Sequence, residues 1–240
     1  MTYITGFHAI EELLRAGKAR GCTLLVAAPG PRVKRIVELA GKSGVEVRRV
    51  QTSELDSAAP DHRGTALVLK EAPKASELDL ADWLSSKLTE RAVVIILDHI
   101  EDPHNLGAIL RSADVFGVDL VIMPERRAAK ETDTVARASA GAIAYVPVAT
   151  VSNLARALEA LKDKGFWTYA ADMGGQPLPT ADLPERVALV MGSEGSGVSR
   201  LLKERCDGIL SIPQYGHVDS LNVSVAAGVF MYELRKRRGN

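Results

Sequence analysis

The sequence has little of several features that mark particular protein classes. Only two of its 240 residues are cysteine, Cys22 and Cys206, which is too few for a disulfide framework and provides no paired C-x-x-C motif for zinc. No apolar run approaches the roughly 18 residues that a membrane span needs, and the first residues lack the basic and apolar regions of a secretory signal. We therefore expect a cytoplasmic protein with no structural metal and no membrane insertion.

The chain also lacks a net charge, because 30 Lys and Arg residues balance 30 Asp and Glu residues. A basic field over the whole chain that would attract a polyanion is therefore missing. The balance hides an asymmetry, since residues 1–70 hold 11 basic and 7 acidic residues while the remainder holds 19 and 23. The first third is thus the basic part of a protein whose composition, with 46% hydrophobic and 25% charged residues, is that of one or two ordinary globular domains.

The first third predicts a compact α/β unit, followed by a segment of weak periodicity. Between residues 71 and 90 no strand pattern is visible, so we expect domains over 1–72 and 91–240 joined by a linker at 73–90. Ser53 is a candidate N-cap within the first unit. Apolar spacing there predicts helices over 8–15 and 33–40 and strands over 24–28, 45–50 and 65–69.

The remainder predicts strands that alternate with helices, which is typical of a largely parallel sheet covered on both faces. Such sheets bind ligands beyond the carboxyl ends of their strands, so polar and glycine-rich segments directly after strands are the candidate sites. Three segments qualify, after the strands that end at Leu97, Met191 and Ile212. The predicted strands are 93–97, 118–123, 166–170, 187–191 and 208–212, and the predicted helices are 106–116, 153–162, 198–204 and 221–237.

The first segment contains Asn105 as a candidate N-cap, with Arg111 further along the same helix. A guanidinium suits phosphate recognition, although the residues alone also fit a surface arginine paired with Asp114 or another acidic residue. His99 and His104 flank two acidic residues, but their spacing matches no recognised metal site, and we expect a solvated loop there. The helix residues expected to face the sheet are Ile109, Leu110 and Ala113.

The second segment, LVMGSEGSGV at 189–198, has glycines at 192, 195 and 197 that permit tight turns, and Glu194 projects a carboxylate from it. Its spacing matches neither a dinucleotide fingerprint nor a P-loop, and a plain glycine-rich turn would explain it as well. In the third segment, Ser220 and Asn222 stand where the last helix should begin, which capping alone would also explain. The small residues at 226–228 favour close helix packing.

The three segments together resemble the three motifs of the SpoU, or TrmH-like, ribose 2′-O-methyltransferases. The first motif is NLGAILRSAD at 105–114, the second is GSEGSG at 192–197, and the third is Pro213 with SLNVSVA at 220–226. Motif three departs from many members at Gln214 and Tyr215. The segments GFHAIEELL at 6–14 and HRGTALV at 62–68 are similar to the small ribosomal-protein-like RNA-binding domain that precedes the catalytic domain in some members.

The resemblance implies a SPOUT fold, in which the C-terminal part of the α/β domain forms a trefoil knot that binds S-adenosylmethionine, and a homodimer joined near the last helix beside Val229 and Met231. It implies catalytic roles for Arg111, Asn105, Glu194, Ser220 and Asn222, and cofactor contacts from the backbone at Gly192, Ile212 and Leu221. The basic residues expected to contact RNA are Arg15, Lys18, Arg20, Arg32, Lys34 and Arg35.

The implied activity is methylation of a ribose 2′-OH in RNA, most closely as in the members that act on a guanosine of 23S rRNA. A tRNA or other rRNA methyltransferase of the same family is the nearest alternative. A non-catalytic RNA-binding or ribosome-assembly protein on the same fold is a further one, although intact motifs disfavour it. A nicotinamide-dependent enzyme is disfavoured because its fingerprint loop is missing.

Overall fold

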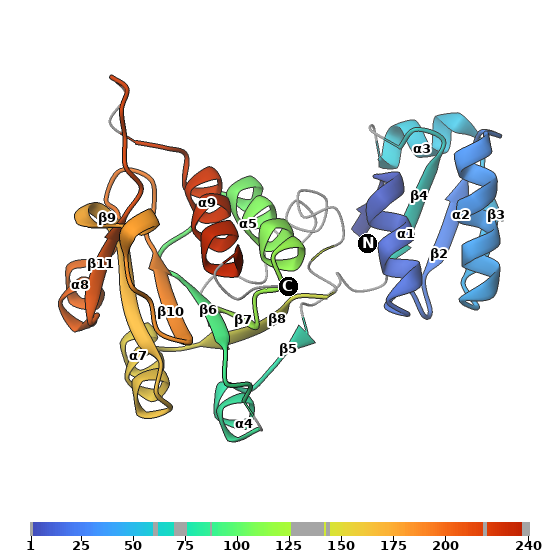
Figure 1. Ribbon diagram of the computed structural model, residues 1–240. Helices are drawn as coiled ribbons and strands as arrows, with labels where there is room; N and C mark the ends of the chain where they lie inside the picture. The colour runs from blue at the N-terminus through green and yellow to red at the C-terminus, as the bar shows by residue number, and fades with distance from the viewer. Residues whose placement is uncertain are drawn as a thin grey trace.

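The computed structural model describes residues 2–59, 62–69, 76–86, 88–125, 142, 145–217 and 220–236. These residues form two sheets in separate parts of the molecule (Figure 1). Where the structure describes the chain, no helix is both long and apolar enough to cross a membrane.

The first part is a four-stranded sheet with helices, built by residues 2–69. Strand order is β1-β4-β2-β3, in which β2 and β3 are parallel and β4 runs against its neighbours. The predicted strand over 65–69 is confirmed residue for residue, whereas β1 was not expected. The elements are β1 (Thr2–Ile4), α1 (Phe7–Arg15), β2 (Thr23–Val26), α2 (Pro31–Lys42), β3 (Glu46–Arg49), α3 (Thr52–Ala58) and β4 (Thr65–Leu69).

The second part is a seven-stranded sheet of order β11-β9-β10-β6-β7-β8-β5, and every pairing in it is parallel. The predicted fold class, a parallel α/β sheet preceded by a small α/β domain, is confirmed; the trefoil knot stays a prediction. The strands are β5 (Ser76–Glu77), β6 (Ala92–Leu97), β7 (Leu120–Pro124), β8 (Pro147–Val151), β9 (Trp167–Pro177), β10 (Arg186–Met191) and β11 (Gly208–Ser211).

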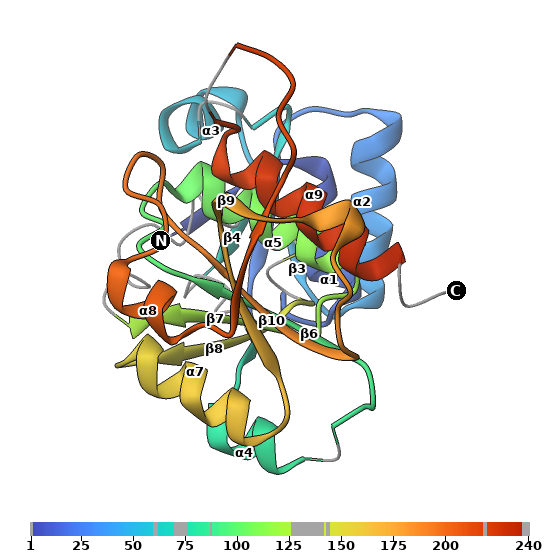
Figure 2. The same ribbon diagram turned by 60° about the vertical axis from the view of Figure 1, so that its left-hand side comes forward.

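Helices cover both faces of this sheet, as Figure 2 also shows. All six residues of β6 are buried, so its side chains alternate between two apolar layers. Val93, Ile95 and Leu97 pack with α5 (Pro103–Val115) and α9 (Val223–Lys236). Val94 and Ile96 pack in the other layer, whose helices are α4 (Leu80–Ser85), α7 (Leu154–Asp163) and α8 (Arg200–Arg205).

Several sequence expectations differ from the structure. The interval expected to be a structureless linker holds β5, which pairs with β8 at the sheet edge, and α4, whose start Asp79 caps. β9 continues to Pro177, beyond the predicted end at 170, and β8 was not expected. Ser53 lies inside α3, because Gln51 occupies the N-cap position. The division into two domains stays a prediction.

Candidate active site

The loops after β6 and β10 meet at one edge of the second sheet. The two strands are parallel neighbours in register, with Leu97 opposite Met191 at their carboxyl ends. The Asp98 N–H also donates to the Met191 carbonyl at 2.8 Å. The first two candidate segments therefore leave the sheet side by side, as expected for parallel strands.

Helix α5 begins three residues earlier than the sequence predicted. Asp102 is its N-cap, accepting a hydrogen bond from the His104 N–H at 3.0 Å, and Pro103 takes the first helical position. An Asp followed by Pro is a stronger helix start than Asn105, because proline needs no partner for the missing N–H. The predicted N-cap role of Asn105 is therefore wrong, and its side chain is available for another contact.

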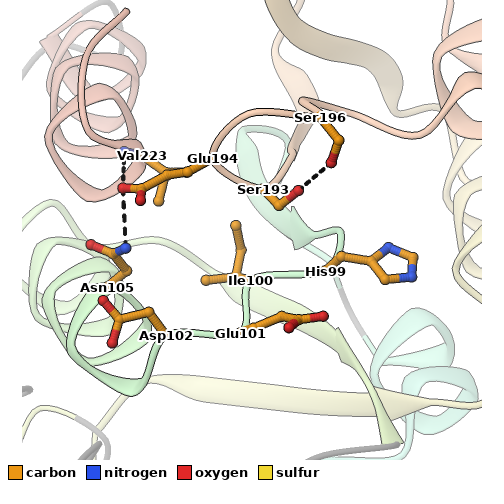
Figure 3. Close-up of a pocket in the computed structure, with 9 residues that line it drawn as sticks. All are labelled: His99, Ile100, Glu101, Asp102, Asn105, Ser193, Glu194, Ser196 and Val223. Atoms are coloured by element: carbon orange, nitrogen blue, oxygen red, sulfur yellow. Dashed lines mark hydrogen bonds between the residues drawn. The ribbon is translucent and has the colours of Figure 1, made fainter.

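Asn105, Glu194 and Asn222 form a hydrogen-bonded group that we call the amide–carboxylate cluster. Asn105 is only 8% exposed, and its Nδ2 donates to Glu194 Oε1 at 3.2 Å. Asn222 Nδ2 donates to Asn105 Oδ1 at 3.0 Å and to Glu194 Oε1 at 2.5 Å. The Val223 N–H also points at Glu194 Oε1, at 3.4 Å (Figure 3). One carboxylate oxygen thus joins three segments that lie far apart in the sequence.

The glycine-rich loop that carries Glu194 turns back on itself. The Gly197 N–H donates to the Ser193 carbonyl at 3.0 Å, and the Ser193 and Ser196 hydroxyls are 2.6 Å apart. A Cβ added at Gly192 would lie 1.9 Å from the Gly197 carbonyl carbon, so any side chain there would displace backbone. Gly192 is therefore required by the fold of the loop itself.

Asp98, the first residue after β6, joins the loop after that strand to the end of the glycine-rich segment. It is 1% exposed, and its Oδ2 accepts a hydrogen bond from the Ser199 N–H at 2.7 Å. Its other oxygen lies 2.6 Å from His99 Nδ1. Sequence reasoning missed Asp98, although a carboxylate that directly follows an apolar strand run was a signal that could have found it.

Asn222 directly precedes α9, which places its side chain in the cluster. Asn222 Oδ1 accepts hydrogen bonds from the N–H groups of Ser224 at 2.9 Å and Val225 at 3.3 Å, so this side chain caps the helix as well. The predicted capping role of Asn222 is confirmed, and its catalytic role stays a prediction. Ser220 is exposed and lies outside the cluster. Helix α9 packs on α5, since Ala227 and Phe230 of α9 lie in the same buried cluster as Ile109 of α5.

Arg111 lies eight residues after Pro103 on α5, on the exposed side of the helix. Within the part of the chain that the structure describes, its guanidinium has no hydrogen-bond or ion-pair partner, so the expected alternative of pairing with Asp114 is wrong. Ile109, Leu110 and Ala113 are buried against the sheet, as predicted.

A pocket of about 420 Å³ opens beside the cluster, between the loop after β6 and the glycine-rich loop (Figure 3). Asn105 and Glu194 form one end of it, whereas Arg111, Ser220 and Asn222 are not among its lining residues. The pocket is lined by His99, Ile100, Glu101, Asp102, Asn105, Ser193, Glu194, Ser196 and Val223.

The segment that follows β11 has free backbone groups. Residues 213–217 make no hydrogen bond to any other described residue, and Tyr215 is 96% exposed. Ile212 and Leu221, the predicted cofactor contacts, flank this segment; Ile212 is half-buried and Leu221 is 43% exposed. Backbone N–H and C=O groups without a partner among the described residues can bind the polar edge of a ligand.

The predicted RNA-binding residues divide into two groups at opposite ends of a helix pair. Ser43 Oγ donates to the Leu14 carbonyl at 3.1 Å, which joins the C-terminal ends of α2 and α1. The Arg32 guanidinium lies 5.8 Å from the centre of the Phe7 ring, which joins their N-terminal ends. The helices therefore run in the same direction, and Arg15, Lys18 and Arg20 lie at one end while Arg32, Lys34 and Arg35 lie at the other.

A contact between the two parts of the molecule lies near α5. The Tyr145 hydroxyl donates to the Glu12 carbonyl at 2.9 Å. Burial, followed by the interaction with the Glu12 side chain, raises the pKa of Tyr145 to about 12. Burial and the nearby Glu12 carboxylate raise the pKa of Asp114 on α5 above its ordinary value. The basic first part thus contacts Tyr145 of the second part, and its Glu12 lies close enough to α5 to influence Asp114.

Comparison of the sequence with known protein families identifies the family to which the chain belongs. Residues 92–232 match the model of the SpoU rRNA Methylase family, and residues 3–75 match the model for RNA 2′-O ribose methyltransferase substrate binding. The protein is an RNA methyltransferase by fold and motif, and the chain belongs to the SpoU rRNA methylase family.

Proteins that are similar over most of the chain are also named as methyltransferases. YacO of Bacillus subtilis, named for the TrmH family of tRNA/rRNA methyltransferases, is 38% identical over 238 residues, which cover 98% of this chain and 96% of YacO. An uncharacterized tRNA/rRNA methyltransferase of Borreliella burgdorferi is 41% identical over 215 residues, covering 86% and 94%. A solved RNA 2′-O ribose methyltransferase is similar with a TM-score of 0.79 and 25% identity, covering 98% of this chain and 88% of its own.

Proposed function

We propose that this protein transfers the methyl group of S-adenosylmethionine to the ribose 2′-OH of a guanosine in 23S rRNA. The amide–carboxylate cluster carries the proposal, because it brings Asn105, Glu194 and Asn222 from the three family motifs into direct contact. Two of the solved structures with the same fold, the rRNA methyltransferase of Sinorhizobium meliloti and AviRb of Streptomyces viridochromogenes, contain AdoMet, which supports the choice of cofactor.

The residues after β10 and β11 suit S-adenosylmethionine. The free backbone of 213–217 and the apolar side chains of Ile212 and Leu221 would hold its adenine. Gly192 shapes the neighbouring loop. When bound, the cofactor would supply a methyl group on a sulfonium. The ribose oxygen would form the new O–C bond as the C–S bond breaks, and the hydroxyl proton would pass to solvent water.

The side chains of the site would position the nucleotide and support the weakly acidic hydroxyl. Arg111 has no partner among the described residues and would bind the adjacent phosphate and stabilise the charge that develops on the 2′-oxygen. A role as base is disfavoured, because a guanidinium is hardly ever deprotonated in a protein. Glu194, Asn105 and Asn222 would fix the loop and helix ends that face the ribose. Ser220 would contact the target nucleotide.

The substrate and assembly are also part of the proposal. The match over residues 3–75 supports RNA as the partner, and the resemblance to guanosine-specific 23S rRNA enzymes favours that RNA over tRNA. A homodimer would form through the face of α9 on which Val225, Val229 and Tyr232 are exposed. Met231, also expected there, is 1% exposed and packs inside the protomer instead.

The test is incubation of the purified protein with labelled S-adenosylmethionine and separate unmodified 23S rRNA, 16S rRNA and tRNA, followed by digestion and identification of the nucleoside. Label in 2′-O-methylguanosine from 23S rRNA is the expected result. Label in tRNA would instead identify the protein as a tRNA methyltransferase of the same family. Cofactor binding without any label would indicate an assembling particle as substrate, and no cofactor binding would overturn the proposal in favour of a non-catalytic RNA-binding protein.

A further inference from the structure

A tight turn of unusual composition precedes β4. The Thr65 N–H donates to the His62 carbonyl at 2.8 Å, which closes a four-residue turn. Its central residues, Arg63 and Gly64, have φ of 47° and 88°. Positive φ at both central positions defines a type I′ turn, where Gly, Asn and Asp are favoured. Arginine is not among these residues, so its presence at the tip needs an explanation beyond the turn.

A buried histidine holds the turn in this conformation. His62 is 7% exposed, and its Nδ1 accepts a hydrogen bond from the Gly64 N–H at 2.9 Å. Since Nδ1 is an acceptor, the ring proton is on Nε2, which donates to Asp56 Oδ1 at 2.9 Å. The ring is therefore fixed on both sides, and the exposed Arg63 side chain projects from a rigid base.

The turn lies against the segment that leads into α2. The Gly64 carbonyl accepts hydrogen bonds from the N–H groups of Ala27 at 2.9 Å and Ala28 at 3.4 Å. Four residues after Ala28 comes Arg32, which is exposed, as are Lys34 and Arg35 in the first turns of α2. One end of the domain thus gathers four basic side chains, Arg32, Lys34, Arg35 and Arg63.

These four side chains differ in their ion pairing from Arg15, which belongs to the basic group at the opposite end. No acidic residue in the described part of the chain forms an ion pair with any of them. Arg15, by contrast, is bound by Glu11 at 3.4 Å and by Glu12 at 2.9 Å. The end with Arg63 therefore keeps its positive charge available for an external anion.

We propose that Arg63 is an RNA phosphate contact, and that the turn 62–65 and the first turns of α2 form the surface of this domain that meets the RNA backbone. The inference rests on the proposed function, in which the substrate is RNA. A guanidinium binds phosphate through two parallel N–H donors, and a rigid base reduces the freedom lost on binding. This contact explains the presence of an arginine at a position whose backbone conformation favours other residues.

The decisive variant is Arg63→Asn, because asparagine tolerates positive φ and removes the charge. Its melting temperature should equal or exceed that of the wild type, while the affinity for a 23S rRNA transcript should fall about fivefold or more. The slope of log K against log salt should decrease in magnitude by about 0.7 to 0.9, as for one lost phosphate contact. Arg63→Lys should recover part of the affinity.

The matched control is Lys42→Gln, which removes one exposed charge from the C-terminal end of α2, opposite the proposed surface. It should leave affinity and salt slope close to wild type. Equal losses in Arg63→Asn and Lys42→Gln, or wild-type affinity in Arg63→Asn, would overturn the inference. If the wild type binds and methylates RNA in that case, the proposed function survives; if the wild type binds none of the RNAs, both fail.

Discussion

The close approach of Gly192 to Gly197 gives the sharpest test of the glycine-rich loop. In Gly192→Ala, the new Cβ would lie 1.9 Å from one backbone atom and 2.1 Å from two others, and ordinary contact needs about 3.4 Å or more. No side-chain rotation can relieve this overlap, because the atoms in contact belong to the main chain. The loop must move by about 1.5 Å, which takes Glu194 out of the amide–carboxylate cluster.

The expected loss of activity is large. A displacement of about 1 Å in a positioning group can cost on the order of 100-fold in rate, so Gly192→Ala should reduce methyl transfer by that factor or more. Gly195→Ala is the control, because its Cβ meets nothing within 4 Å although its φ is +90°. That strain costs about 1–2 kcal/mol, which should lower the Tm by several degrees and leave the rate within a few-fold of wild type.

The assay is transfer of labelled methyl groups to rRNA, with the Tm of each variant measured in parallel. If Gly192→Ala is folded and transfers methyl groups at the wild-type rate, the argument that the loop backbone positions Glu194 is wrong. If Gly192→Ala is too unstable to assay, Glu194→Gln keeps the loop and tests the cluster directly, with an expected loss of more than about tenfold from three weakened hydrogen bonds to one oxygen.

Three further predictions follow from other parts of the molecule. Arg111→Lys keeps the charge but loses the planar guanidinium with its paired N–H donors, so kcat should fall about 100-fold with cofactor affinity unchanged. Near-normal turnover would refute the proposed binding of the adjacent phosphate by Arg111. Burial opposes ionisation of Asp207, but hydrogen bonds from Lys162 and Thr168 outweigh it and hold the pKa of Asp207 below its ordinary value. The charged form therefore stabilises the fold above about pH 4. At pH 7 the Tm of Asp207→Asn should be about 2–4 °C below that of the wild type, and this difference should vanish as the pH falls through the lowered pKa. A difference that stays constant with pH would contradict the prediction. Val229→Glu places a charge on the exposed face of α9, so light scattering should show a folded monomer for this variant and the proposed dimer for the wild type; a monomeric wild type would contradict the proposed assembly.

The strands that contact both layers of the core were the most predictable elements. Unbroken apolar runs such as Val93–Leu97 and Val187–Met191 can only be buried, and both are strands within one residue of the predicted bounds. β8 was missed because Pro147–Val151 is short and mixed in character. β5 was missed because two residues at an edge carry no periodic signal.

The site was predictable as a set of residues and not as a geometry. Motif resemblance selected Asn105, Glu194 and Asn222, yet their contacts join positions 89 and 117 residues apart, and no local pattern encodes such pairings. Local reasoning also misassigned Asn105 as a cap, because Asp102 and Pro103 compete for the same helix start. Asp98 escaped notice since its partner, the Ser199 N–H, is a backbone group of a distant loop.

The order of the strands in the second sheet has a consequence for synthesis of the chain. The central pair joins Ala92 to Arg186, so β6 gains its neighbour β10 only after more than ninety further residues have been added. At about 5–20 residues per second, this apolar strand waits on the order of 5–20 s for β10, although its other partner, β7, is synthesised earlier. The first sheet is complete at Leu69 and can fold long before. We therefore expect the RNA-binding part to emerge folded from the ribosome while the catalytic part still depends on protection from aggregation.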